Sequence, residues 1–178
     1  MYKKIAITNR KLCSNLLEKI TKLDASDYHH IILREKDLPF EAYLSLADTA
    51  TELSNKVILH NHVKVCEMLK YYKIHLPFNI FKDEINRLND YEIIGVSIHS
   101  LKEAQEAEIL GASYITASPV FATKCKENVN PRGLQWLKDI CKGVSIPVYA
   151  LGGVNEENSQ GCIEAGAEGV CMMSEAMK

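Results

Sequence analysis

The chain has 178 residues, of which 47% are hydrophobic and 25% are charged, and 21 Lys and Arg stand against 23 Asp and Glu for a formal net charge of −2. This composition excludes a disordered chain, a collagen-like repeat and a low-complexity linker, and the length predicts a single domain, residues 1–178, with a core of its own. The near-neutral charge argues against nucleic acid or an anionic membrane as a partner, and no apolar run reaches the roughly 20 residues that span a bilayer.

Short apolar segments alternate with amphipathic ones from one end of the chain to the other. The short segments are rich in Ile, Val, Leu and Tyr and are mostly bounded by glycine or polar residues, which predicts β-strands. Eight strands are expected, over residues 4–8, 29–33, 57–60, 73–76, 93–97, 113–117, 146–151 and 168–172.

Helices are predicted in the intervals between these strands. Within residues 13–23, Leu and Ile recur at spacings of three and four, which places them on one helical face. Another helix follows Ser100, a good N-cap, with Glu103 at the position that completes a capping box. Gly111 and Gly166 each stand between a helical pattern and a strand, where a glycine with positive φ ends a helix.

Eight strands that alternate with helices predict a (β/α)8 barrel, the TIM-barrel fold. The alternative is an open, doubly wound sheet, but the segment after the first strand, residues 8–11, has none of the glycines of a nucleotide-binding turn. Residues 174–178 are too few for an eighth helix, so the barrel is expected to lack its last helix. An apolar flank left uncovered there would favour a homo-oligomer.

The six cysteines are spaced widely and unevenly, and no two of them form a Cys-x-x-Cys pair. This spacing is typical of neither a disulfide framework nor a zinc site. The apolar part of the amino terminus, residues 5–7, is too short for a signal peptide. We therefore expect reduced thiols in a soluble, cytoplasmic protein.

Active sites of such barrels lie at the carboxyl ends of the strands, so the residues there are the first candidates. Arg34 and Lys36, after the second strand, project to the same side of an extended chain, while Glu35 between them points away. Two cations at a barrel mouth suit a phosphate or diphosphate. The alternative is a solvated charged loop with no role in catalysis.

The loops after the last strands predict a second place for a phosphate. Gly152 and Gly153 let backbone N–H groups approach a ligand, and Ser174 is expected to open a short helix whose amides favour an anion. A simple turn with a packing glycine is the alternative. After the sixth strand, Thr123 and Lys126 offer hydroxyl and ammonium donors on a long loop that could close as a lid.

Histidines at strand ends are candidates for acid–base chemistry, namely His60, His62, His75 and His99. The rings of His60 and His62 share one face if the third strand extends that far. Because no carboxylate accompanies them, polar active-site histidines or hydrogen-bonded core histidines are favoured over a metal site.

Five segments carry a resemblance to a known family: residues 33–37, 95–104, 118–126, 146–154 and 164–174. As an ordered set that covers nearly the whole chain, they resemble the thiamine-phosphate synthase/TenI family. The resemblance implies a barrel that binds a hydroxyethyl-thiazole phosphate. Thiamine-phosphate synthases join this thiazole to a hydroxymethyl-pyrimidine diphosphate with Mg²⁺ and expel pyrophosphate, whereas TenI-type relatives act as thiazole tautomerases or have no firm activity.

By position, the resemblance divides the candidate phosphate ligands into two groups. The group expected to hold the thiazole phosphate is Gly152, Gly153 and Ser174. The group expected to face the diphosphate is Arg34, Lys36, Thr123 and Lys126.

Three positions separate the two branches of the family. After the third strand, His60-Asn61-His62 stands where synthases carry an Asn-Asp pair that helps to hold Mg²⁺, and we assign Asn61 to substrate binding. After the fourth strand, residues 77–80 are like the TenI branch and lack the acidic residues of synthases. After the sixth strand, Pro119 is like synthases and replaces the proton-shuttling His of TenI.

We therefore expect a TenI-like thiazole tautomerase, in which His60, His62 or His75 transfers a proton on a phosphate-anchored thiazole. One alternative is a thiamine-phosphate synthase with different metal ligands, which alone would use Mg²⁺. Another alternative is a non-catalytic, regulatory barrel that keeps the phosphate site. No other cofactor is expected.

Overall fold

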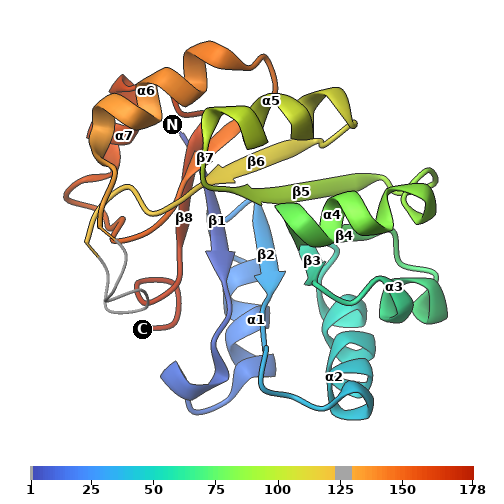
Figure 1. Cartoon of the computed structure of the whole chain (residues 1–178). Helices are drawn as coiled ribbons and strands as arrows, with labels where there is room; N and C mark the ends of the chain where they lie inside the picture. The colour runs from blue at the N-terminus through green and yellow to red at the C-terminus, as the bar shows by residue number, and fades with distance from the viewer. Residues whose placement is uncertain (1, 123–129) are drawn as a thin grey trace.

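The computed structural model describes residues 2–122 and 130–178 (Figure 1). Its strands form a closed, parallel barrel in chain order, in which β8 pairs back with β1. The strands are β1 (Lys3–Ile7), β2 (His30–Leu33), β3 (Val57–His60), β4 (Lys73–Pro77), β5 (Ile93–Ile98), β6 (Tyr114–Ala117), β7 (Val148–Ala150) and β8 (Gly169–Met172). The predicted TIM-barrel fold is confirmed.

Helices follow the strands on the outside of the barrel (Figure 1). The described helices are α1 (Leu16–Asp24), α2 (Phe40–Leu53), α3 (Val63–Leu69), α4 (Phe78–Glu84), α5 (Leu101–Ile109), α6 (Gly133–Gly143) and α7 (Ser159–Glu164), with 3₁₀ turns η1 (Arg10–Leu12) and η2 (Ile85–Arg87). None of them is long and apolar enough to cross a membrane.

The boundaries of the elements follow local chemistry. Helix α1 begins at Leu16 because the Asn15 side chain caps it, accepting a hydrogen bond from the backbone N–H of Glu18 (3.2 Å). Ser100 is confirmed as the N-cap of α5, since its Oγ accepts from the N–H of Glu103 (3.1 Å), but the Glu103 carboxylate accepts from the N–H of His99 (2.6 Å) and not from that of Ser100, which a capping box requires. Strand β7 is shorter than predicted and starts after Pro147, which has no N–H to donate.

Two apolar layers build the core. One lies between the barrel and its helices, and the other fills the barrel with residues that include Ile5, Ile58, Tyr114 and Tyr149. The rings of Tyr114 and Tyr149 meet edge to face, 5.4 Å between centroids. A Cβ at Gly95 would collide with the Tyr114 ring, so this glycine makes the room that the ring needs.

The flank of β8 is covered, although no helix follows this strand up to residue 178. Val170 and Met172 belong to the layer outside the barrel and are 0% and 2% exposed. The chain turns back after β8, so that Ala176 and Met177 join the same buried layer. The apolar flank is therefore not left uncovered, and the homo-oligomer stays a prediction.

Replacing Gly95 with Ala is expected to lower the free energy of unfolding by about 1–3 kcal/mol, because the added methyl overpacks the barrel interior. Urea denaturation followed by circular dichroism measures this loss. Gly161→Ala is the matched control, because in α7 its Cβ meets only the flexible end of Leu134 and the helix gains propensity. Equal stability of Gly95→Ala and the wild-type protein would contradict the proposed crowding.

Candidate functional site

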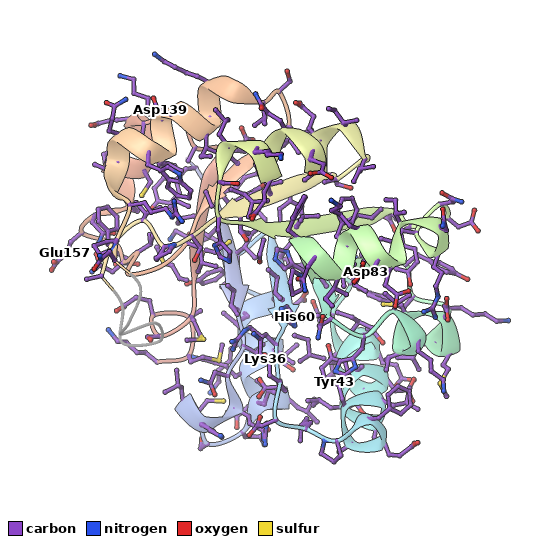
Figure 2. The ribbon with its side chains drawn as sticks, in the orientation of Figure 1. Lys36, Tyr43, His60, Asp83, Asp139 and Glu157 are labelled. Atoms are coloured by element: carbon purple, nitrogen blue, oxygen red, sulfur yellow. The ribbon has the colours of Figure 1, made fainter. Side chains whose placement is uncertain are left out.

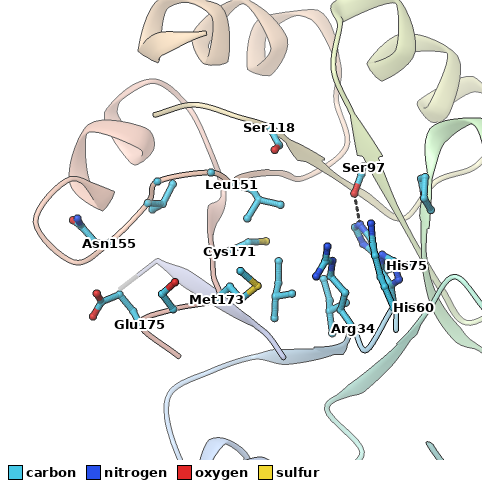
Figure 3. Close-up of a pocket in the computed structure, with 18 of the residues that line it drawn as sticks. Arg34, His60, His75, Ser97, Ser118, Leu151, Asn155, Cys171, Met173 and Glu175 are labelled. Atoms are coloured by element: carbon cyan, nitrogen blue, oxygen red, sulfur yellow. Dashed lines mark hydrogen bonds between the residues drawn. The ribbon is translucent and has the colours of Figure 1, made fainter. Parts of the chain in front are cut away.

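A cavity of about 440 Å³ opens among the carboxyl ends of the strands (Figure 3). Strand residues on its floor and walls include Ile7, Ile32, His60, His75 and Cys171, and the loops supply the rest of the lining. This is the end of the barrel at which the sequence places the active site.

Arg34 and Lys36 both line this cavity, as the alternation along the extended chain predicts. Glu35 points the other way and is 3% exposed, with its carboxylate accepting a hydrogen bond from Thr8 Oγ1 (2.7 Å). The Arg34 guanidinium makes no hydrogen bond or ion pair with any residue that the structure describes. These placements favour the anion-binding interpretation of the two cations over a solvated loop.

Gly152, Gly153 and Ser174 line the cavity as well. The two glycines have φ of +96° and +65°, and a Cβ on Gly152 would lie 2.7 Å from Cβ of Pro119. The two glycines therefore allow the chain to pack closely against residues 119–122, and without side chains they do not shield their own backbone from the cavity.

The short helix expected at Ser174 is wrong. Residues 174–177 form a single turn, closed by the backbone hydrogen bond from Met177 N to Met173 O (3.1 Å). One such bond does not propagate into a helix. Ser174 thus offers its hydroxyl and the amides of a turn rather than the end of a helix.

His75 is held on both sides of its ring within the barrel. Nδ1 lies 3.0 Å from the Tyr114 hydroxyl, and Nε2 lies 2.7 Å from Ser97 Oγ (dashed line in Figure 3). Thr116 Oγ1 extends the chain by donating to Ser97 Oγ (3.1 Å). Burial lowers the pKa of His75 to about 3, so the ring is neutral at pH 7. With both nitrogens engaged, His75 is a hydrogen-bonded core histidine on the cavity wall.

His60 stands beside His75, with ring centroids 6.0 Å apart and planes 15° from parallel. Its backbone N–H donates to the Tyr43 hydroxyl (2.9 Å), which donates to Leu33 O (2.8 Å; Figure 2 labels Tyr43 and His60). Burial is the main cause that holds the pKa of His60 well below its ordinary value, and the neighbouring His75, Arg34 and Lys36 lower it further, in that order. The imidazole makes no hydrogen bond to the described residues and so can meet a ligand in the cavity.

The expectation that His60 and His62 share a face is wrong. Strand β3 ends at His60, and Asn61 adopts a left-handed φ of +65°, which redirects the chain. His62 then packs its ring 4.2 Å from the ring of Tyr43, and Asn61 is exposed. Neither His62 nor Asn61 lines the cavity, so of the three proposed bases the structure brings only His60 and His75 to it.

Several lining residues were not singled out from the sequence, among them Ser97, Ser118 and Asn155. Ser97 had a signal, because it lies at the end of a predicted strand. No sequence pattern indicates that Ser118 lines the cavity. In the folded chain its carbonyl oxygen lies 2.7 Å from Nδ1 of His99. The predicted phosphate ligands Thr123 and Lys126, with the proposed lid, lie outside the described residues.

The described residues do not fit the Mg²⁺ that the family resemblance implies. Mg²⁺ prefers carboxylate oxygens, and the only carboxylate among the described lining residues is Glu175, which pairs with Lys178 (2.5 Å). No group of three or more His, Cys, Asp and Glu in residues 2–122 and 130–178 is placed to hold a metal. Near His60, the described lining residues are instead the cations Arg34 and Lys36 and the neutral imidazole of His75.

Comparisons with known proteins agree on one family. Residues 5–176 match the family described as thiamine monophosphate synthase. The chain is 35% identical over 175 residues to a putative thiamine-phosphate synthase 2 of Aquifex aeolicus, covering 95% of this chain and 94% of that protein. It is 31% identical to a thiamine-phosphate synthase of Syntrophomonas wolfei, covering 99% and 88%. The solved thiamine phosphate pyrophosphorylase of Pyrococcus furiosus matches with a TM-score of 0.82 at 28% identity, covering 99% of this chain and 87% of that one.

The buried histidines predict how stability changes with pH. The pKa values of His60 and His75 are depressed in the folded state, so below the ordinary value near 6.5 only the unfolded chain takes up their protons. The stabilisation of the folded state by these two neutral histidines is complete above that pH and is lost as the pH falls. We expect His75 to cost about 2 kcal/mol of unfolding free energy between about pH 7 and pH 5, and His60 to lower the stability in the same direction.

Urea denaturation at these two pH values measures the loss, and His75→Gln is expected to reduce it by about 2 kcal/mol, which is the part that comes from His75. The window keeps the carboxylates largely ionised, which separates the effect from acid denaturation. A pH dependence of His75→Gln equal to that of the wild-type protein would show that His75 is not neutral in the folded chain.

Proposed function

Because the chain belongs to the thiamine monophosphate synthase family, we propose that it is a thiamine-phosphate synthase, which joins a thiazole phosphate to a hydroxymethyl-pyrimidine diphosphate. The departures after the third and fourth strands favour a TenI-like tautomerase, but the names of the relatives favour the synthase. Both activities would use the same cavity.

One observation carries the proposal, namely that two walls of the cavity present polar groups suited to an anion. Arg34 lies with His60 and His75 at one side, and Asn155, near the glycine pair, lies at the other (Figure 3). A volume of about 440 Å³ falls within the range of small-molecule sites. A tautomerase acting on one monophosphate needs one such wall, whereas the coupling of a monophosphate to a diphosphate needs two.

The proposed reaction forms a bond between the thiazole nitrogen and the methylene carbon of the pyrimidine. The bond from that carbon to the diphosphate oxygen breaks, and pyrophosphate leaves with the electron pair. Arg34 and Lys36 offset the charge that develops on the leaving group. Leu151 and Met173 lie between these two sides (Figure 3), and Ile32 also lines the cavity, so apolar side chains are available to pack against the two aromatic rings.

The decisive assay incubates the protein with both substrates, with Mg²⁺ and with EDTA, and measures thiamine phosphate by chromatography. We expect product formation that falls about 100-fold in Arg34→Ala, because a preorganised donor to the leaving group is lost. Ser174→Ala is expected to raise the KM for thiazole phosphate by about 10-fold through one lost hydrogen bond. Lys22→Ala, which removes an exposed cation of α1, is the control. Absence of thiamine phosphate under both conditions would overturn the synthase proposal.

A thiazole tautomerase is the second candidate, and His60 is the observation that favours it. Its neutral ring faces the cavity without a hydrogen-bond partner among the described residues, and Pro119 leaves no histidine at the shuttle position of the TenI branch. This candidate predicts that His60→Gln lowers tautomer conversion about 100-fold, while the synthase proposal predicts a change in thiamine phosphate formation of less than about 10-fold. Proton exchange and isomer ratio followed by NMR distinguish the two.

A further inference from the structure

We propose that Thr8 and Glu35 are positioning residues, which hold Arg34 against the cavity so that it can bind a phosphorylated ligand. The inference deepens the proposed function and rests on it, because it takes Arg34 as a ligand of the substrate. Neither Thr8 nor Glu35 lines the cavity.

The Thr8 hydroxyl joins the ends of β1 and β2. Thr8 is fully buried, and its Oγ1 accepts a hydrogen bond from the backbone N–H of Arg34 (2.9 Å) while donating to Glu35 Oε1 (2.7 Å). Its own backbone N–H donates to Ile32 O (2.9 Å). One hydroxyl therefore fixes both the backbone of Arg34 and the side chain that follows it.

The Glu35 carboxylate is anchored from a second direction by Arg10. Both of its oxygens accept from the backbone N–H of Arg10 (3.1 Å each), and Oε2 also accepts from Arg10 Nη1 (3.2 Å). Arg10 in turn binds Asp37 through Nη1 (2.6 Å) and Nη2 (2.9 Å), and this pairing raises the pKa of Arg10 and lowers that of Asp37. The loop is thus fastened to the end of β1 at Glu35 and at Asp37.

This fastening decides where Arg34 points. Arg34 and Glu35 follow the end of β2 and point to opposite sides, and the chain then turns, with Leu38 N donating to Glu35 O (3.2 Å). With the acidic pair fixed against Arg10, Arg34 and Lys36 are left to the cavity side. The Arg34 guanidinium has no protein partner among the described residues. The direction of this side chain is therefore set by its backbone, which the Thr8 hydroxyl holds.

Stability alone is a weak reason for such an arrangement. A buried carboxylate costs desolvation energy, and an apolar group of similar shape often serves stability equally well. Glu35, the buried carboxylate, stands in the sequence directly between Arg34 and Lys36, which both line the cavity, and this position points to a role in ligand binding. Its loss should therefore change ligand affinity more than it changes stability.

Ser54 offers a matched control at the other end of the barrel. It is 4% exposed and donates to a carboxylate, Asp24 Oδ1 (2.5 Å), as Thr8 donates to Glu35. It precedes β3, whereas the cavity lies beyond the carboxyl ends of the strands. Ser54→Ala removes the same kind of hydrogen bond without touching the loop of Arg34.

The test is calorimetric titration with inorganic pyrophosphate in EDTA, and with thiazole phosphate as the second probe. We expect Thr8→Val to weaken pyrophosphate binding about 10-fold, close to one lost hydrogen bond to a charged group. Thr8→Ser keeps the hydroxyl and is expected to stay within about twofold of the wild-type affinity, as is Ser54→Ala. Glu35→Gln, which conserves side-chain size, is expected to weaken binding like Thr8→Val and replaces it should that variant not fold.

A double-variant cycle separates positioning from general weakening. If Thr8 acts through Arg34, then Thr8→Val combined with Arg34→Ala binds pyrophosphate within about twofold of Arg34→Ala alone. Full additivity of the two losses, or wild-type affinity in Thr8→Val and Glu35→Gln, would overturn the positioning role while leaving the proposed function standing. Failure of the wild-type protein to bind either probe would overturn both, and that result is read from the wild-type titration alone.

Discussion

The interior of the closed barrel is too narrow for large side chains at every position, and two tyrosines occupy much of it. Tyr114 and Tyr149 pack edge to face. A Cβ on Gly95 would strike the Tyr114 ring, and a Cβ on Gly169 would strike the backbone of Lys3 and then the Tyr149 ring. A buried phenol needs a hydrogen-bond partner, which the structure supplies as His75. His75 then binds Ser97, so the packing of the barrel determines which polar groups form one wall of the cavity.

The net charge of −2 does not show that acidic and basic side chains lie on different sides of one loop at the barrel mouth. In the loop that follows β2, Glu35 and Asp37 face away from the cavity and pair with Arg10. Arg34 and Lys36 of the same loop line the cavity. Burial of the Glu35 carboxylate is tolerated because four donor contacts satisfy it. The same local sequence thus supplies both the cations of the site and the anions that fasten them.

The fold and part of the site could be predicted because they depend on local pattern. Buried parallel strands are short apolar runs, and the facing of Arg34 follows from a period of two. The fate of His62 could not be predicted, because it depends on a left-handed φ at Asn61, which a residue other than glycine adopts infrequently. The burial of Met177 in the same layer as Val170 and Met172 likewise depends on how the chain folds in three dimensions, and no periodicity carries that information.

The electrostatics around His60 bear on the choice between the two enzymatic functions. As a base, His60 is weakened by burial and by Arg34, and the pKa would rise if an anion neutralised that cation. A tautomerase substrate whose phosphate sits at Gly152 and Ser174 leaves Arg34 unneutralised, so His60 stays a poor proton acceptor when it is needed. A diphosphate on Arg34 would relieve only the part of this effect that comes from Arg34, because burial is the main cause and remains. The coupling reaction forms and breaks bonds to carbon without a proton transfer by His60, so the low pKa of His60 is no obstacle to the proposed synthase. Arg34, which lowers the pKa of His60, is also a cation that suits a departing diphosphate, and this arrangement agrees with the proposed synthase better than with a tautomerase that uses His60 as its base.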